Sequence, residues 1–145
     1  MAINVKQVTL WRKEVDNRAG VLASTLEPIA RAGVDLQVVM GYRYPGNETK
    51  AAIEVYPVTG KKAASAAQAA NLTASAIPTL HVEGDNRPGL GYAIARALAD
   101  AGINISFEVA QVIGRRFSAI FGFETDDQAK KAAAVIKRAV AGKRK

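Results

Sequence analysis

Two short turns contain the residues of this chain whose types and spacing suit ligand chemistry. They are Asp16-Asn17-Arg18-Ala19-Gly20 and Asp85-Asn86-Arg87-Pro88-Gly89-Leu90. Each turn stands between an expected strand and an expected helix, and the first backbone N–H groups of a helix have no partner within it. Together with the positive end of the helix dipole, these N–H groups favour a carboxylate. Each turn is therefore a candidate binding site for a small anion.

The side chains of the turns add features that suit a zwitterion. Asn17 and Asn86 each offer an amide donor and an amide acceptor, which a ligand with a carboxylate and an ammonium group requires. Gly20 and Gly89 have no Cβ, so a ligand or a neighbouring chain can approach the backbone closely. Pro88 fixes φ at the helix start before a ligand arrives. We therefore expect the turns to hold a small amphoteric molecule.

A purely structural role for the turns stays open. A sequence such as Asp-Asn-Arg-Pro-Gly also forms polar turns in which Asp or Asn caps a helix and Gly allows tight packing. For Asp16 and Asp85, helix capping is the better interpretation, because no nucleophile accompanies these two carboxylates. Gly89-Leu90-Gly91 lacks the third glycine of a dinucleotide fingerprint. The sequence thus predicts no catalytic site, no enzyme activity and no cofactor.

The turns belong to a longer internal repeat. Ala32-Gly33-Val34 returns as Ala101-Gly102-Ile103, and Ala51-Ala52-Ile53 corresponds to Ser118-Ala119-Ile120. The repeat divides the 145 residues into two domains, which we place at 1–76 and 77–145. Domains of roughly 70 residues are near the lower limit for an independent core, so each is expected to need a neighbour.

The hydrophobic pattern predicts the same order of elements in both domains, namely strand, helix, strand, strand, helix. In the first domain the strands cover 5–15 (one long strand or two collinear ones), 34–44, 50–56 and 72–76, and the helices cover 19–32, with an irregularity at Pro28 and a cap at Gly33, and 59–70. In the second domain the strands cover 77–83, 103–113 and 117–124, and the helices cover 88–101 and 126–141, the latter capped by Thr125 or Asp126. Helices on one face of a four-stranded antiparallel sheet make each domain a ferredoxin-like βαββαβ unit of the α+β class.

The second domain lacks a closing strand of its own. We expect residues 2–7, at the start of the overlong first strand, to supply the missing edge, either within the chain or from a partner chain.

Composition limits the class of protein. The chain is 49% apolar and 23% charged, as a packed globular protein is. It contains no cysteine and a single histidine, His81, so neither a disulfide nor a metal site is expected. The sequence shows no leader pattern and no apolar run long enough for a membrane helix, so we expect a cytoplasmic protein without a membrane partner.

The net charge of +7 is concentrated at the C-terminus. The basic residues there are Lys137, Arg138, Lys143, Arg144 and Lys145. Such a tail suits solubility and compensation of a helix dipole better than nucleic-acid binding. An RNA-binding module remains an alternative, because the same strand order builds RNA-recognition domains, although the Lys/Arg-Gly-Phe signature of those domains is absent.

The turn, the predicted helix and the segment Ala101–Ile105 together resemble the ACT domain, a small regulatory module of amino-acid metabolism. The resemblance covers nearly the whole chain in two copies. It implies the βαββαβ order, side-by-side association into continuous sheets, and binding of an amino acid at the interface near the turn.

The resemblance also implies which residues contact a ligand. The asparagine at the start of the following strand in serine-binding members corresponds to Asn104, and Asp35 replaces it in the first copy. The histidine before the turn in those members is absent, so serine is not implied. The expected ligand-binding residues are Asp85, Asn86, Arg87, Pro88, Gly89, Leu90 and Asn104 in the second copy, and Asp16, Asn17, Arg18, Ala19, Gly20 and Asp35 in the first.

The implied function is that of a non-catalytic regulatory protein. Its expected partners are an amino acid, a second copy of the chain in a dimer formed through sheet or helix packing, and a regulated enzyme or regulator protein. A purely structural dimerisation module is a further alternative.

Overall fold

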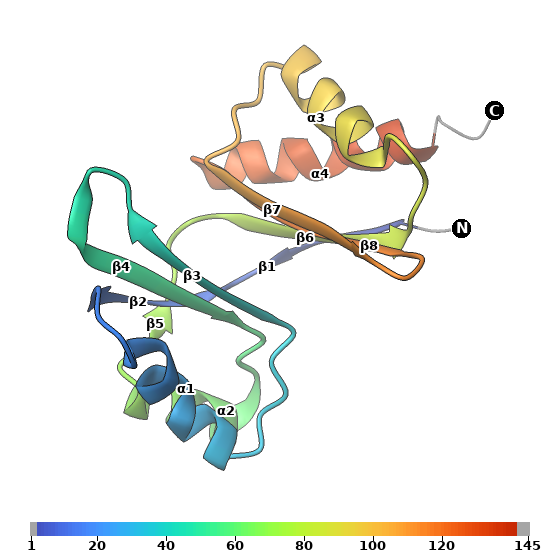
Figure 1. Cartoon of the computed structure of the whole chain (residues 1–145). Helices are drawn as coiled ribbons and strands as arrows, with labels where there is room; N and C mark the ends of the chain where they lie inside the picture. Colours follow the sequence, from blue (N-terminus) through green and yellow to red (C-terminus); the bar gives the residue numbers. More distant parts are fainter. Residues whose placement is uncertain (1–2, 142–145) are drawn as a thin grey trace. The chain divides into compact units, whose positions relative to one another are not determined.

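The computed structural model describes residues 3–141, which form two compact units (Figure 1). The N-terminal unit comprises residues 9–76, and the C-terminal unit comprises residues 3–8 together with 77–141. Each unit contains a four-stranded sheet in which all paired strands are antiparallel. The predicted α+β class, with two ferredoxin-like units in tandem, is confirmed.

In the N-terminal unit two helices cover one face of a sheet with the strand order β3-β4-β2-β5 (Figure 1). Its elements are β2 (Trp11–Asp16), α1 (Val21–Arg31), β3 (Val38–Tyr44), β4 (Asn47–Tyr56), α2 (Gly60–Ala69) and β5 (Thr73–Ala74). The core contains Val15, Ile53 and Val55 from the sheet and Ile29 from α1. Helix α2 contributes the small side chains of Ala66 and Ala67, which explains why its apolar stripe is weak.

The C-terminal unit repeats this arrangement with the order β1-β6-β8-β7. Its elements are β1 (Ile3–Val8), β6 (Thr79–Asp85), α3 (Leu90–Asp100), β7 (Phe107–Ile113), β8 (Arg116–Gly122) and α4 (Asp126–Ala141). Its core is larger, because Phe117 and Phe121 of β8 pack with Ile94 of α3 and Ile136 of α4. Each such side chain, fully buried, contributes roughly 1.5–3 kcal/mol.

The first strand supplies the edge that the second half of the sequence lacks. β1 pairs with β6 in antiparallel register from Ile3↔Gly84 to Val8↔Thr79. The expected donation of the N-terminal segment is thus confirmed within the chain for residues 3–7, while residue 2 lies outside the described part. The segment expected as one strand or two collinear strands is two strands that belong to different sheets. The unit boundary accordingly differs from a division at residue 76, since residues 3–8 join the other unit.

The repeat in the second hairpin is shifted by one residue from the correspondence proposed above. Val15 pairs with Ala51 in the N-terminal unit, whereas Gly84, which takes the place of Val15, pairs with Phe117 in the C-terminal unit. Ala51 therefore corresponds to Phe117 and not to Ser118. Only this register turns Phe117 and Phe121 toward the helices, because successive strand residues face opposite sides of a sheet.

In each unit, the strand that follows the first helix begins later than expected. β3 begins at Val38 and β7 at Phe107, because the chain first closes the helix end: the Val34 N–H donates to the Ile29 carbonyl, and the Ile103 N–H to the Leu98 carbonyl. Gly33, with φ 73°, is the predicted left-handed cap.

Two sequence-based expectations concern the irregularity of α1 at Pro28 and the cap of α4, and the structure confirms the second. α1 continues through Pro28 and ends three residues later, so this proline does not terminate it. At α4 the Thr125 hydroxyl accepts a hydrogen bond from the Gln128 N–H at 3.1 Å, which makes Thr125 the cap.

Candidate functional site

The two turns before α1 and α3 share one backbone geometry. The Leu90 N–H donates to the Arg87 carbonyl at 3.2 Å, and the Val21 N–H to the Arg18 carbonyl at 3.4 Å. Gly89 has φ 81° and ψ 3°, and Gly20 has φ 90° and ψ −10°. These are the angles of the third residue of a type II turn, which glycine adopts without strain. A Cβ at either glycine would meet nothing within 4 Å, so the backbone angle, and not packing within the chain, requires glycine.

Pro88 has a different role from the one expected. Gly89 is the N-cap of α3 and Leu90 is its first residue, so Pro88 is not the first helical residue. It is the second residue of the type II turn, a place that its fixed φ favours. Ala19 occupies the same place in the first turn.

The expected capping role of the two aspartates is wrong. Within the described residues, no side chain caps α1 or α3. Asp16 accepts a hydrogen bond from Lys50 Nζ at 2.8 Å, and Asp85 accepts one from Arg116 at 3.2 Å. The Lys50 hydrogen bond lowers the pKa of Asp16 below its usual value. The carboxylates therefore join neighbouring strands, and the first N–H groups of both helices are left to other partners.

Asn17 is tied to the hairpin between β3 and β4. Its backbone N–H donates to the Thr49 carbonyl at 2.9 Å, and its side-chain amide donates to the Glu48 carbonyl at 2.8 Å. Asn86 repeats the backbone contact, since its N–H donates to the Arg115 carbonyl at 2.8 Å. In each unit the asparagine thus fixes the turn against the following hairpin.

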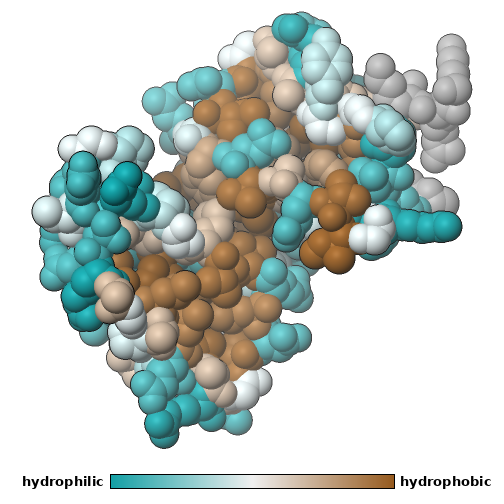
Figure 2. Space-filling view, viewed as in Figure 1, coloured by the Kyte–Doolittle hydropathy of each residue, from teal (hydrophilic) through white to brown (hydrophobic). Residues whose placement is uncertain are grey.

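A hollow of about 240 Å³ lies beside the first turn, within the N-terminal unit. It is lined by Val15, Asn17, Val21, Leu22, Gly41, Tyr42, Arg43, Ala51, Ala52 and Ile53. These residues come from β2, the turn and start of α1, β3 and β4. Figure 2 shows apolar surface, in brown, over the part of this unit where β3 and β4 run. The hollow combines an apolar lining with the polar residues Asn17 and Arg43 and with Tyr42, whose hydroxyl is bonded to Glu54.

Asp35 lies at a second hollow of the same unit. This hollow measures about 300 Å³ and also includes Gly33, Pro57 and Lys62. Asn17 does not line it. Within the N-terminal unit the structure therefore places these two expected ligand residues at different hollows.

The other expected site residues are divided between the surface and the core. Arg18, Ala19, Pro88 and Asn104 are exposed. Leu90, at 1% exposure, is part of the core of the C-terminal unit. Arg87 is half-buried, and its Nη2 atom is buried without a hydrogen-bond partner in the described chain.

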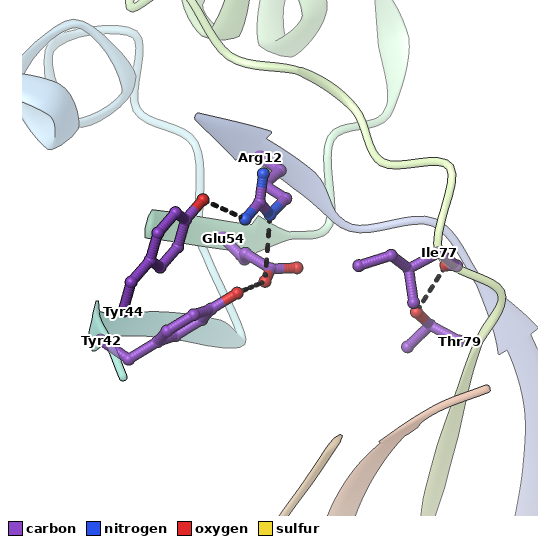
Figure 3. Close-up of polar contacts among 6 residues, drawn as sticks. All are labelled: Arg12, Tyr42, Tyr44, Glu54, Ile77 and Thr79. Atoms are coloured by element: carbon purple, nitrogen blue, oxygen red, sulfur yellow. Dashed lines mark hydrogen bonds and ion pairs between the residues drawn. The ribbon is translucent and has the colours of Figure 1, made fainter. Parts of the chain in front are cut away.

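One polar cluster was missed by the sequence analysis (Figure 3). Tyr42 donates to Glu54 Oε2 at 2.7 Å, and Arg12 Nη2 donates to the Tyr44 hydroxyl at 2.6 Å. Arg12 Nε lies 3.6 Å from Glu54 Oε2. The four side chains link β2, β4 and β3 on the face of the sheet opposite to the core. The pKa of Tyr42 is raised above its usual value, mainly by burial and secondly by its hydrogen bond to Glu54. Figure 3 also shows, in the C-terminal unit, the Thr79 hydroxyl donating to the Ile77 carbonyl at 2.9 Å.

Gly41 and Arg43 were also missed as lining residues of the first hollow. They lie two residues apart in β3, and so share one face of that strand. A glycine and a charged residue on the inner face of a predicted strand were the available signal.

Residues 3–141 show neither a metal-binding cluster nor a membrane-spanning helix. His81 is 4% exposed in β6, where burial lowers its pKa. No group of three His, Cys, Asp or Glu side chains in that range could hold a metal ion. No helix there is long and apolar enough to cross a membrane. Of the basic C-terminal residues, Lys137 and Arg138 lie in α4, and the other three lie outside the described range.

Comparisons with known proteins find the fold in solved structures. No family model and no curated protein matches the sequence. The structure of protein BT0572 from Bacteroides thetaiotaomicron is similar with a TM-score of 0.70 at 13% identity, over 92% of this chain and 98% of that one. The ligand-free regulatory subunit of aspartate kinase from Thermus thermophilus is similar with a TM-score of 0.60 at 17% identity, over 94% and 95%.

A whole enzyme shows the same likeness over part of its length. Aspartate kinase from Clostridium acetobutylicum matches 94% of this chain with 33% of its own, with a TM-score of 0.57 at 16% identity. At such identities the likeness concerns the fold. It confirms that this chain has the tandem ACT-like fold that the repeated turn, helix and strand predicted.

Proposed function

We propose that this chain is a non-catalytic regulatory protein that binds an amino acid at the turns before α1 and α3. The hollow beside Asn17 carries the proposal, because it places an apolar lining and polar side chains next to a helix start whose N–H groups no described side chain caps. The structural neighbours support it, since they include a regulatory subunit of aspartate kinase and an allosteric aspartate kinase.

Binding at such a site would act by favouring one arrangement of the protein over another. The ligand carboxylate would replace water at the helix N–H groups, and the ammonium group would meet an amide oxygen. Linkage of this kind is typically worth about 1–3 kcal/mol, which changes an affinity about 5- to 150-fold. The regulated partner is an enzyme or a regulator protein.

The proposal includes association of copies of the chain through the edges of the sheets. β3 and β7 each have one neighbour in the described sheets, and each is seven residues long. Val39 of β3 and Val109, Val112 and Ile113 of β7 are exposed. Unpaired backbone groups flanked by apolar side chains favour pairing with another strand.

RNA binding is the weaker candidate. Base-stacking domains need exposed aromatic side chains on central strands. Here Phe117 and Phe121 of the central strand β8 are 4% and 1% exposed. Tyr42 is more exposed but lies on the edge strand β3, with its hydroxyl bonded to the acidic Glu54.

The experiment that tests the proposal is a thermal-shift screen of the whole chain with each of the twenty amino acids at millimolar concentration. At least one amino acid should raise the melting temperature. Gly20→Asp and Gly89→Asp should abolish the response at their own turn, because they place a negative charge at the ligand carboxylate. Gly60→Asp is the matched control, since Gly60 has a positive φ of 85°, between those of Gly89 and Gly20, and lies outside both turns. A chain that no amino acid stabilises would contradict the proposal.

A further inference from the structure

We propose that the hollow of the N-terminal unit selects amino acids with aliphatic side chains, and that Arg43 holds the ligand carboxylate there. This inference rests on the proposed function and names the ligand class of one of its sites. It assigns a specificity-determining residue that lies outside the two repeated turns.

The lining of the hollow determines the class of side chain. Its buried part includes Val15, Ala51 and Ile53, at 6%, 9% and 2% exposure, and Val21 and Leu22 border it from α1. A charged or amide side chain would lose its water on this apolar surface and gain no partner, which is costly. An aliphatic side chain would lose only unfavourable contact with water.

The size of the hollow agrees with a small ligand. Its volume of about 240 Å³ exceeds the roughly 150 Å³ of an engineered cavity that holds benzene. It lies slightly below the range of roughly 300–1,000 Å³ that accommodates drug-sized molecules. An amino acid with a short branched side chain fits these limits.

Arg43 supplies the positive charge. It lines the hollow from β3, opposite Ala51 in the register, and its side chain has no hydrogen-bond or ion-pair partner in the described chain. A guanidinium group presents two parallel N–H donors that match a carboxylate. The ligand carboxylate would therefore pair with Arg43, near the uncapped start of α1.

Asn17 supplies the complementary acceptor. One N–H of its side-chain amide is bonded to the Glu48 carbonyl, which fixes the orientation of the amide. Its Oδ1 atom remains an acceptor for the ligand ammonium group. The hollow thus offers hydrogen-bond donors to a ligand carboxylate, an acceptor to a ligand ammonium group, and an apolar surface to the ligand side chain. These three features together suit an aliphatic amino acid.

Gly41 keeps the hollow open. Its φ lies outside the left-handed range, and a Cβ there would meet nothing within 4 Å, so neither strain nor packing requires glycine. The second copy has Ala110 in place of Gly41 and Val112 in place of Arg43, as the matching registers of β3 and β7 show. The guanidinium group, and with it the aliphatic site, belongs to the N-terminal unit.

Calorimetric titration of the whole chain tests this inference, with leucine, isoleucine and valine as probes and with serine, glutamate and lysine as comparisons. The aliphatic amino acids should bind most tightly. Gly41→Val should weaken their binding at least tenfold by filling the hollow, and its β-branched side chain suits a strand. Ala110→Val is the matched control in the second copy and should leave the affinity unchanged.

Ligand analogues separate the contribution of Arg43 from that of the apolar lining. Arg43→Gln should weaken leucine binding about tenfold to a hundredfold, the usual effect of losing a charged hydrogen bond. It should leave unchanged the affinity for isopentylamine, which lacks the carboxylate. Arg115→Gln, at an exposed hairpin position of the other unit, is the control.

The outcomes distinguish this inference from the proposed function. If an amino acid binds but Gly41→Val and Arg43→Gln do not change its affinity, or if serine, glutamate or lysine binds best, the inference is wrong and the proposed function stands. If none of the twenty amino acids binds, both are wrong.

Discussion

The residues of the repeated turns show how one sequence feature can have several physical causes. Gly20 and Gly89 are required by positive φ, whereas Pro88 is favoured, but not required, at the second position of a type II turn. Asp16 and Asp85 instead pair with basic residues on the neighbouring strand. The turns therefore have a fixed backbone whose helix N–H groups no side chain of the described range caps, which is the condition for an anion to bind there.

The ion pair between Asp16 and Lys50 predicts a pH dependence. The Lys50 hydrogen bond lowers the pKa of Asp16 in the folded protein, so the pair stabilises the fold fully above pH 3.8, the ordinary value. The contribution disappears as the pH falls through the lower folded-state pKa. A carboxyl titration followed by NMR should show the depressed pKa, and Lys50→Met should raise it toward the ordinary value. An Asp16 pKa that is equal in both proteins would contradict the pairing.

Elements were predicted best where the signal is local. The helices follow their periodic apolar residues and their glycine caps, so their bounds agree with expectation to within two residues. The strand starts at Val38 and Phe107 were missed, because the closing of the preceding helix uses the backbone groups of residues 34 and 103. The one-residue shift in β8 was missed for another reason: register depends on a partner strand far away in sequence.

The candidate site, like the elements, was predicted only where its residues are close together in the sequence. The turns were found because their residues are contiguous and repeated. The hollow was not found from the sequence, because its lining comes from four separate segments, which contribute Val15, Leu22, Gly41 and Ile53. Arg43 acquires its role through the register that places it opposite Ala51, and the sequence predicts the hairpin of β3 and β4 but not that register.

The element β1 is predicted to be essential to the C-terminal unit. It forms six residue pairs with β6, and Ile3 and Val5 pack against the core. Deleting residues 1–6 should expose that edge of β6, lower the melting temperature and favour association through the new edge. Calorimetry and sedimentation of the shortened chain measure both effects. An unchanged melting temperature and an unchanged mass would contradict the role assigned to β1.

At the scale of the whole molecule, the proposed association through sheet edges predicts which surface substitutions separate the copies. A lysine on an edge strand opposes pairing, because it brings charge next to the unpaired backbone groups. Val109→Lys combined with Ile113→Lys should therefore lower the mass measured by sedimentation, since both side chains are exposed on β7.

The matched control for β7 is Tyr92→Lys on α3, which changes a side chain that is 71% exposed on a helix. If the copies associate through the edges of their sheets, this substitution leaves the mass unchanged. If Tyr92→Lys separates the copies and the β7 variant does not, the association is through helix packing and the sheet-edge proposal is wrong. The β7 variant adds charge without removing a core side chain, so its effect on mass can be separated from unfolding by measuring the melting temperature of the same sample.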